Sequence, residues 1–509
     1  MIGRTLLATF VSTAFGAFVS CSGTAVAEEE GPPAVHAGAR DLAAFYKSLK
    51  GSPLGALYKN AQVKEFLAHY LKPLGITLTG ARNKAATDAL DRLLSGASGP
   101  AELLVPQADS KKGMLPGFAA SVGAAKPAQA LKEIQTLMKS APAGTLDEKS
   151  SKADGKKTLT YTVKPPQKGR PQVRFPFEKL SFVESKNGLV ITNLDHPKAL
   201  ALLSGDIDAA GKGDAIEIAF AAGALRSLLK PFADYVPGGP AVVNVRSEAS
   251  GLVAVARFIG ADIGQSPFRY LGGHPATLPQ PGIADAYAEM AARLNLAGAW
   301  DTFWAELKRR SAAEHFAARA TLLEIEKNMG VRVAEELIPA LEGSVVAYRA
   351  GAEGRLVLVL RVAREATVKK AVEALAAFGG KPGAGESGTY EIRMAGGERT
   401  PGSDAGTWYA RVAGGFLVLS AHEGVVKAFP GSSALTTSSG PVAMSADVPK
   451  AYAAEHSAQK NRSIVDKQRG PVLFPPSLLA GKLGKVTVRS SRDGDDFVLD
   501  AELKYARGK

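Results

Sequence analysis

Cysteine is almost absent from this chain, and that absence excludes several kinds of site. Cys21 is the only cysteine among 509 residues. The chain therefore cannot form an intrachain disulfide, and it cannot build a zinc or iron–sulfur site from several cysteines. A chain of this length can bury cores large enough to fold without such cross-links. We expect its stability to come from packing.

Catalytic signatures are equally scarce. The seven histidines are scattered, and no pair has the HExxH spacing of a zinc helix. The GxGxxG match at Gly383–Gly388 follows a predicted helix and precedes a predicted strand, which reverses the order that a dinucleotide site needs. Ser227–Lys230 and Ser457–Lys460 fit SxxK, but the chain lacks the SDN and KTG partners of that mechanism. We predict no catalytic residues, no metal, no cofactor and a protein that is not an enzyme.

Long hydrophobic runs are missing beyond the N-terminus. The most apolar later run, Leu356–Val362, contains Arg361 and alternates like a strand. It is also far shorter than the roughly 18 residues needed to span a bilayer. We expect no transmembrane segment in the mature chain.

The N-terminus has the pattern of an export signal. A basic start is followed by the apolar run Leu6–Val19 and by the small residues Ala25 and Ala27, which form a cleavage site before Glu28. We predict that residues 1–27 are a signal peptide and that the protein lies in the periplasm or cell envelope. Phe18–Cys21 also resembles the lipobox of bacterial lipoproteins, so lipidation of Cys21 is the alternative to cleavage at Ala27.

The clearest positive feature is an internal repeat. Five segments of the first half recur in the same order in the second half, each with a similar pattern of apolar residues. The matched pairs are Phe45–Lys50 with Phe303–Lys308, Phe118–Val122 with Leu358–Val362, Asn187–Thr192 with Gly414–Leu419, Ile216–Phe220 with Val442–Ala446, and Val243–Ser247 with Val486–Ser490. The offset between partners drifts along the chain, as insertions in loops would cause.

This repeat predicts the fold class. We expect an α+β protein with two tandem duplicated domains, each a mainly antiparallel sheet covered by helices. The expected order is a signal peptide at 1–27, a first domain at 28–265, a linker rich in Gly and Pro at 266–282 and a second domain at 283–509.

Positive charge gives the only global indication of a partner. The net charge is +13, and Arg4 is the only charged residue of the leader, so removal of the leader gives +12. Two basic stretches lie where the repeat alignment opens a gap, and we predict that they are exposed loops contacting an anionic envelope surface or an envelope protein. The residues are Lys164, Lys168, Arg170, Arg174, Arg462, Lys467 and Arg469. Solvated connectors without a partner are the alternative. We expect no nucleic acid, since no aromatic residues interleave these charges.

Two of the three tryptophans lie one helical turn apart. Trp300 and Trp304 share a helix face that Phe303 flanks. Packing of this helix onto its sheet is the favoured interpretation, and an aromatic lining of a ligand groove is the alternative.

Two stretches of the chain resemble a bacterial family. The motifs are Ser52–Tyr58 followed by Val63–Leu67, and Leu341–Ala347 leading into Leu356–Leu360. They are similar to segments of an uncharacterised exported envelope family known only as a domain of unknown function. The resemblance implies an exported protein, often anchored to a membrane, and it implies no catalytic or binding residues.

Three functions remain open on the sequence. The first is a non-enzymatic envelope protein that binds or scaffolds a partner. The second is a carrier of lipid or another hydrophobic ligand in a groove between sheet and helices. The third is an enzyme whose site is assembled from distant residues, which buried ionisable groups gathered in one cleft would favour.

Overall fold

The computed structural model describes the chain in segments. These are residues 34–63, 84–106, 117–139, 145–153, 156–164, 178–186, 188–194, 215–228, 237–260, 271, 277–280, 285–351, 354–378, 388–393, 407–429, 434–437, 440–460 and 474–506. The predicted processing residues Cys21, Ala25 and Ala27 lie outside the described residues. So do Lys168, Arg170, Arg174, Arg462, Lys467 and Arg469, six of the seven predicted contact residues.

The chain folds into two compact units. The first consists of Met1–Ser266, Arg469–Leu483 and Asp493–Lys509, and the second of Pro267–Gln468 and Gly484–Arg492. The predicted domains 28–265 and 283–509 are contiguous in sequence, whereas these units are not.

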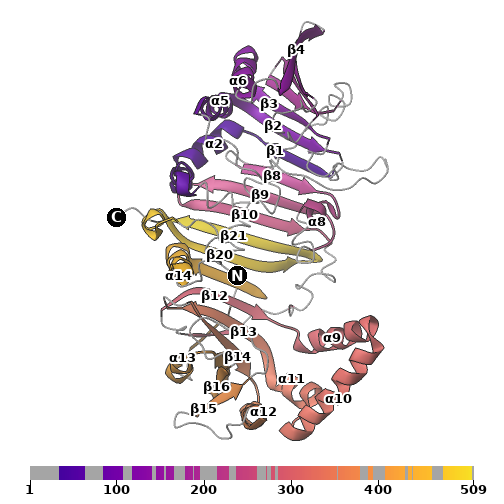
Figure 1. Ribbon diagram of the computed structural model, residues 1–509, viewed down its shortest axis with the longest axis vertical. Helices are drawn as coiled ribbons and strands as arrows, with labels where there is room; N and C mark the ends of the chain where they lie inside the picture. Colours follow the sequence, from indigo (N-terminus) through magenta and orange to yellow (C-terminus); the bar gives the residue numbers. More distant parts are fainter. Residues whose placement is uncertain are drawn as a thin grey trace, which may run out of the picture. The chain divides into compact units, whose positions relative to one another are not determined.

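The first unit is built on an antiparallel sheet of eleven described strands. Their order is β4-β5-β6-β7-β3-β2-β1-β8-β9-β10-β21, and Figure 1 shows β1, β8, β9, β10 and β21 side by side. The strands are β1 (Val35–Ala39), β2 (Ala97–Val105), β3 (Ala119–Ala124), β4 (Leu146–Ala153), β5 (Lys156–Val163), β6 (Lys179–Ser185), β7 (Gly188–Thr192), β8 (Ala215–Phe220), β9 (Ala241–Glu248), β10 (Gly251–Phe258) and β21 (Asp496–Tyr505).

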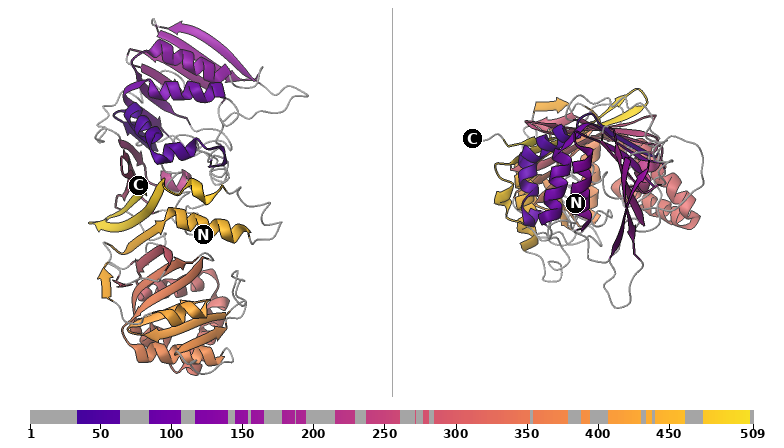
Figure 2. Two further views of the ribbon diagram at one scale, coloured as in Figure 1. Left: turned by 90° about the vertical axis from the view of Figure 1, so that its left-hand side faces the viewer. Right: turned by 90° about the horizontal axis from the view of Figure 1, so that it is seen from above.

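Helices cover one face of this sheet. In Figure 2 the indigo and purple helices stand in front of the strands of the first unit. They are α2 (Leu42–Gly51), α3 (Pro53–Tyr58), α5 (Lys84–Ser95) and α6 (Pro127–Lys139). A further short helix, α8 (Ala224–Leu228), follows β8. Helix α2 packs against β2, β8 and β9, and α6 packs against β6 and β7.

Local signals explain where α2 begins and which side it buries. The carboxylate of Asp41 accepts a hydrogen bond from the Ala44 backbone N–H at 2.8 Å, which satisfies one of the free donors at the helix start. Phe45 and Leu49 are buried one turn apart, so one stripe of α2 is apolar and faces the sheet.

Eight described strands of the second unit pair with their neighbours in antiparallel fashion. Their order is β15-β16-β17-β14-β13-β12-β19-β20, and a short pair, β11–β18, is separate. The strands are β11 (Thr277–Gln280), β12 (Ala286–Arg293), β13 (Leu341–Ala350), β14 (Arg355–Val362), β15 (Thr389–Arg393), β16 (Thr407–Ala413), β17 (Phe416–Ser420), β18 (Ala434–Thr437), β19 (Val442–Asp447) and β20 (Leu483–Asp493).

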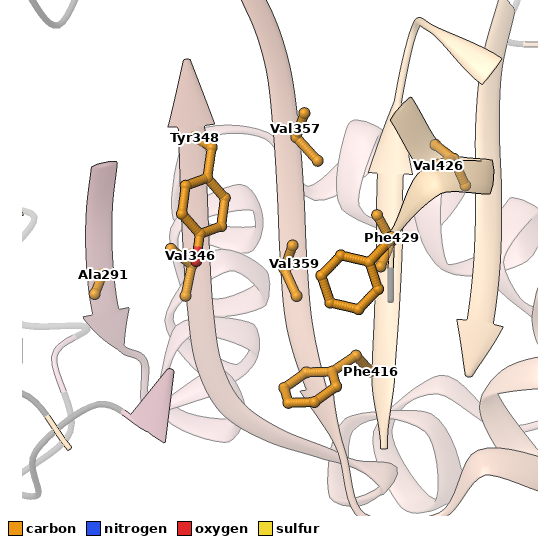
Figure 3. Close-up of a cluster of buried hydrophobic side chains, with 9 residues drawn as sticks. Ala291, Val346, Tyr348, Val357, Val359, Phe416, Val426 and Phe429 are labelled. Atoms are coloured by element: carbon orange, nitrogen blue, oxygen red, sulfur yellow. The ribbon is translucent and has the colours of Figure 1, made fainter. Parts of the chain in front are cut away.

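Both faces of the second sheet carry apolar clusters. Figure 3 shows one of them, in which Tyr348, Val359 and Phe416 from neighbouring strands meet Val426 and Phe429 from α13 and the residue after it. On the other face, α12 packs Val368 and Val372 against β15, β16 and β17. The helical segments of this unit are α9 (Leu296–Arg310), α10 (Ala312–Met329), the π-helix η6 (Val333–Leu337), α11 (Ile338–Ala340), α12 (Glu365–Phe378), α13 (Glu423–Ala428) and α14 (Val448–Lys460); the 3-10 turn η7 (Pro476–Leu478) belongs to the first unit.

The α+β class with mainly antiparallel sheets and covering helices is confirmed. All the strand pairings whose register is defined are antiparallel, and helices pack on the sheets of both units. Alternating burial along β9 and β13 accounts for this arrangement, because alternate side chains of a strand point to opposite faces.

A β-bulge interrupts β2 and another interrupts β13. In β2 the register shifts between Ala97 and Ala101, and in β13 it shifts between Leu341 and Val345. Each bulge contains a glycine with positive φ, Gly99 at 77° and Gly343 at 75°. Such φ values favour glycine, because other L residues meet steric strain there.

These two glycines differ in their surroundings, which gives a matched test. A Cβ on Gly343 would lie 2.2 Å from the Leu294 carbonyl oxygen, whereas a Cβ on Gly99 would meet no atom within 4 Å. Both alanine substitutions carry the cost of positive φ, about 1 kcal/mol. We expect Gly343→Ala to lower the free energy of unfolding by roughly 2 kcal/mol more than Gly99→Ala does. Urea unfolding measures the difference, and equal losses would contradict the proposed close approach at Gly343.

Candidate functional site

Lys164 is the one described member of the predicted basic contact set. Its side chain is half-buried beyond the end of β5, and its Nζ lies 2.7 Å from Oδ1 of Asp147. This cation is therefore already paired within the protein. The role predicted for the seven basic residues stays a prediction, since the other six lie outside the described residues.

One buried and one half-buried carboxyl group are candidates for an enzymatic site. In the first unit, Glu102 is only 5% exposed, and its Oε1 lies 3.0 Å from Nε2 of His36 on the neighbouring strand. Burial raises the pKa of Glu102, and His36 opposes that shift through its charge and hydrogen bond. In the second unit, burial likewise raises the pKa of Glu289, and the charge of Lys485 lowers it in part.

Neither carboxyl group is the centre of a recognisable catalytic set. Glu102 and Glu289 belong to different units. The charged neighbour that lowers the pKa is His36 for Glu102 and Lys485 for Glu289. Among the described residues, no group of three or more His, Cys, Asp or Glu side chains could hold a metal ion. We interpret Glu102–His36 as a buried pair within the sheet.

The acidic turn Asp493–Asp496 is part of an ion-pair network. Arg257 places one guanidinium nitrogen 2.8 Å from Asp493 and another 3.0 Å from Asp496. Asp496 also accepts a hydrogen bond from the Gly260 backbone N–H at 2.9 Å. The turn itself needs Gly494, whose φ is 61°. These contacts give the acidic residues a structural role at the turn.

The most distinctive surface of the described residues is a helical hairpin in the second unit, made of α9 and α10. We call residues 295–330 the helical arm. Figure 1 shows it to the side of the strands of this unit. Asn295 accepts from the Gly298 N–H to begin α9, Ser311 accepts from the Glu314 N–H to begin α10, and Gly330 ends α10 with a φ of 61°. Side-chain caps and a left-handed glycine therefore define both helices locally.

Trp304 joins the two helices of the arm. It is 7% exposed, and the guanidinium carbon of Arg319 on α10 lies 4.2 Å from the centre of its ring. His315 meets the same ring edge to face at 5.6 Å, and Trp300 does so at 5.5 Å. The indole N–H has no hydrogen-bond partner among the described residues, so Trp304 is held by packing and by cation–π attraction.

The packing partner of α9 differs from the one the sequence favoured. The sequence matches Phe45–Lys50 in α2 with Phe303–Lys308 in α9, and α2 packs on its sheet. Helix α9 instead packs against α10 and α11. In the second unit it is α14 that packs against β12 and β19. The shared face of Trp300 and Trp304 therefore serves packing of helix on helix.

Helix α10 is apolar on two opposite sides. On one side, His315, Ala318 and Leu322 are half-buried and Met329 is buried, where α10 packs against α9 and α12. On the other side, Phe316 is 77% exposed and Leu323 is 65% exposed. Because these two residues are seven apart, they point the same way.

We call this second side the open stripe; it consists of Ala313, Phe316, Ala320 and Leu323, all exposed. Large aliphatic and aromatic side chains at such exposure and at helical spacing form an apolar surface of the kind found at interaction sites. The spacing of 3, 4 and 3 residues is visible in the sequence. Sequence reasoning missed it because an apolar stripe on a helix normally indicates a buried face.

Comparison with known proteins adds no family. No family model matches the chain, and no curated protein matches it in sequence. Two crystal forms of TP0453 are weakly similar. Form III is 9% identical with a TM-score of 0.27, covering 51% of this chain and 89% of TP0453. Form I is 10% identical with a TM-score of 0.23, covering 46% and 75%. A likeness at this level carries no argument about fold or function.

In the described part of the chain, no helix combines the length and the apolar character needed to span a bilayer.

The raised pKa of Glu102 predicts a dependence of stability on pH. Because its pKa in the folded protein lies above the ordinary value of 4.5, the folded state holds this proton to higher pH than the unfolded state does. Stability from this group is therefore greatest at low pH and falls as pH rises from 4.5 through the folded pKa. Glu102→Gln should remove that fall in urea unfolding measured across this range. Glu217, which pairs with Gly38 from the opposite side of β1, supplies the control Glu217→Gln. A pH profile unchanged by Glu102→Gln would contradict the assignment.

The buried ring of Trp304 predicts that the arm depends on it. Truncating a buried tryptophan to alanine costs about 3–5 kcal/mol. We expect Trp304→Ala to speed hydrogen exchange of the α9 and α10 amides roughly a hundredfold or more. Phe303→Ala is the matched control, because Phe303 is 53% exposed on the same turn of α9. Comparable acceleration in both variants would show that Trp304 does not hold the arm.

Proposed function

We propose that this protein is a non-enzymatic binding or scaffolding protein of the cell envelope, exported by its N-terminal leader, and that the helical arm presents its binding surface. The observation that carries the proposal is the open stripe: α10 is already packed on one side, yet it exposes Phe316 and Leu323 on the other. Exposing these side chains to water is unfavourable, and a partner that covers them recovers that free energy.

We also propose that the two units are copies of one ancestral domain. The order of pairing supports this idea. In the first unit eight strands run β5-β6-β7-β3-β2-β1-β8-β9, and in the second they run β15-β16-β17-β14-β13-β12-β19-β20. Each strand of one list holds the same place in the chain order of its unit as its counterpart in the other. The bulges at Gly99 and Gly343 also fall in counterpart strands, β2 and β13.

A pair of buried hydroxyls supports the same idea at atomic detail. Thr192 ends β7, donates to the Phe118 carbonyl at 2.7 Å and accepts from the Leu194 N–H at 2.9 Å. Ser420 ends β17, donates to the Leu356 carbonyl at 2.9 Å and accepts from the His422 N–H at 3.2 Å. Both side chains are fully buried. The same two hydrogen bonds thus close the counterpart strands.

If the two units are copies, the different packing of α2 and α9 is informative. Helices α2 and α9 hold the same place in the chain order of their units, yet α2 packs on its sheet whereas α9 packs against α10 and α11. If the units are copies, the second has kept the strand order of its sheet and changed the packing of one helical segment. The change therefore affects the surface of the unit and not its sheet. This contrast favours binding over catalysis, because the changed segment carries exposed apolar residues and no catalytic set that we recognise.

A photo-crosslinking experiment tests the binding role. A photoreactive phenylalanine analogue replaces Phe316 in the full chain, which is then irradiated in intact cells. The control places the same group at Leu375 on α12, which is 39% exposed. We expect crosslinked adducts from position 316 at several times the yield from position 375. Equal yields, or none from position 316, would refute the arm as the binding surface.

The same purified chain tests the location. We expect its N-terminal sequence to begin at Glu28, or its N-terminus to be blocked by an acylated Cys21. An intact Met1 would refute export by the leader.

A further inference from the structure

The open stripe alternates small and large residues. Along α10 it reads Ala313, Phe316, Ala320 and Leu323, which is small, large, small and large. The spacing of 3, 4 and 3 residues is that of the contact positions in paired helices. A stripe with this alternation has a simple property: when a second copy runs in the opposite direction, each large side chain falls opposite a small one.

From this self-complementarity we infer that the partner of the open stripe is a second copy of this chain, bound by antiparallel pairing of α10 with α10 about a two-fold axis at the level of residue 318, one residue from Ala317. This inference rests on the proposed binding role of the arm. In this register Phe316 packs over Ala320 of the second copy, and Leu323 packs over Ala313 of the second copy. The two reciprocal contacts follow from the symmetry, as an isologous interface requires.

Small residues near the axis permit close approach. Ala317 is exposed beside the stripe, and Ala313 and Ala320 lie on it. Three alanines within eight residues let two helix backbones come closer than leucine or isoleucine would allow, and large side chains from the other copy fill the space above them.

Charge favours the antiparallel direction over the parallel one. The basic run Lys308, Arg309 and Arg310 precedes the start of α10, and its one acidic neighbour in α9 is Glu306, which Arg309 pairs with at 2.9 Å. The far end of α10 carries Glu324, Glu326 and Lys327, whose charges sum to −1. Antiparallel pairing brings this end of each copy toward the basic run and the positive helix start of the other. Parallel pairing would bring like charges together.

The sequence of α10 also favours this antiparallel register over a shifted one. Sliding the second copy by seven residues moves the axis to between residues 321 and 322 and places Phe316 opposite Lys327 of the second copy and Ala313 opposite Gly330. That arrangement keeps one reciprocal apolar contact, Ala320 with Leu323, where the first register has two. The register centred on residue 318 is the one in which all four members of the stripe are covered by members of the stripe.

Cysteine crosslinking tests this register directly. In a chain carrying Cys21→Ser, we introduce Ala317→Cys near the axis, and Asn328→Cys as an exposed control on the same helix. Because a helix rises 1.5 Å per residue, two copies of position 328 would lie about 30 Å apart in this register, beyond the reach of a disulfide. We expect oxidation to convert most of the Ala317→Cys chain to covalent dimer, at least tenfold more than the Asn328→Cys chain. Equal yields would overturn the inference.

Solution mass provides an independent test. The full chain should show about twice the mass of one chain by light scattering at tens of micromolar. The variant Phe316→Asp with Leu323→Asp should raise the dissociation constant of the dimer at least tenfold, because it buries carboxylates at the centre of the interface. Both positions are exposed in one copy, so unchanged circular dichroism will show that the fold is intact. The control is Glu314→Gln with Thr321→Ser, which changes exposed positions beside the stripe and should leave the mass unchanged.

The outcomes separate this inference from the proposed function. A dimer whose Ala317→Cys chain crosslinks supports both. A chain that stays monomeric at about 100 micromolar while its Phe316 photo-adducts have the mass of a different protein overturns the second copy and leaves the binding role standing. A monomer without preferential adducts at Phe316 overturns both.

Discussion

Alternate side chains of a β-strand point to opposite faces of the sheet, and each apolar face must be covered by other parts of the chain. This requirement determines where the helices of the protein pack. In the first unit the cover includes α2 and α6. In the second it includes α12 and α14, with α13 on the opposite face. Helix α14 packs against β12 and β19, whereas α9, in the segment between β12 and β13, packs against α10 and α11.

Alternation made much of the fold predictable. The matched segment Val243–Ser247 lies within β9, and the run Leu356–Val362, which alternates like a strand, lies within β14. Period-2 burial is a local property, so it can be read from one segment at a time. The order of the strands in each sheet is not local, and only the internal repeat gave an indication of it.

The candidate site was less predictable, for a physical reason. The sequence indicated that Trp300 and Trp304 share a packed face, but it could not indicate whether a sheet or a second helix packs there. The open stripe of α10 has the spacing of a buried stripe, and burial depends on what the rest of the chain places over it. Charge was similarly ambiguous: Lys164 belongs to a basic stretch, yet the structure pairs it with Asp147.

The pairing of β21 with β10 has a consequence for how the protein is made. All eight residues of β10, from Gly251 to Phe258, pair with residues 497–504, which are synthesised more than two hundred residues later. Until then the backbone donors and acceptors along that side of β10 lack these partners and can template pairing with another chain. Loss of β21 would therefore leave the first unit with an open strand edge, although the missing residues are more than two hundred positions away. The interval in which this edge is exposed ends only when β21 has been made.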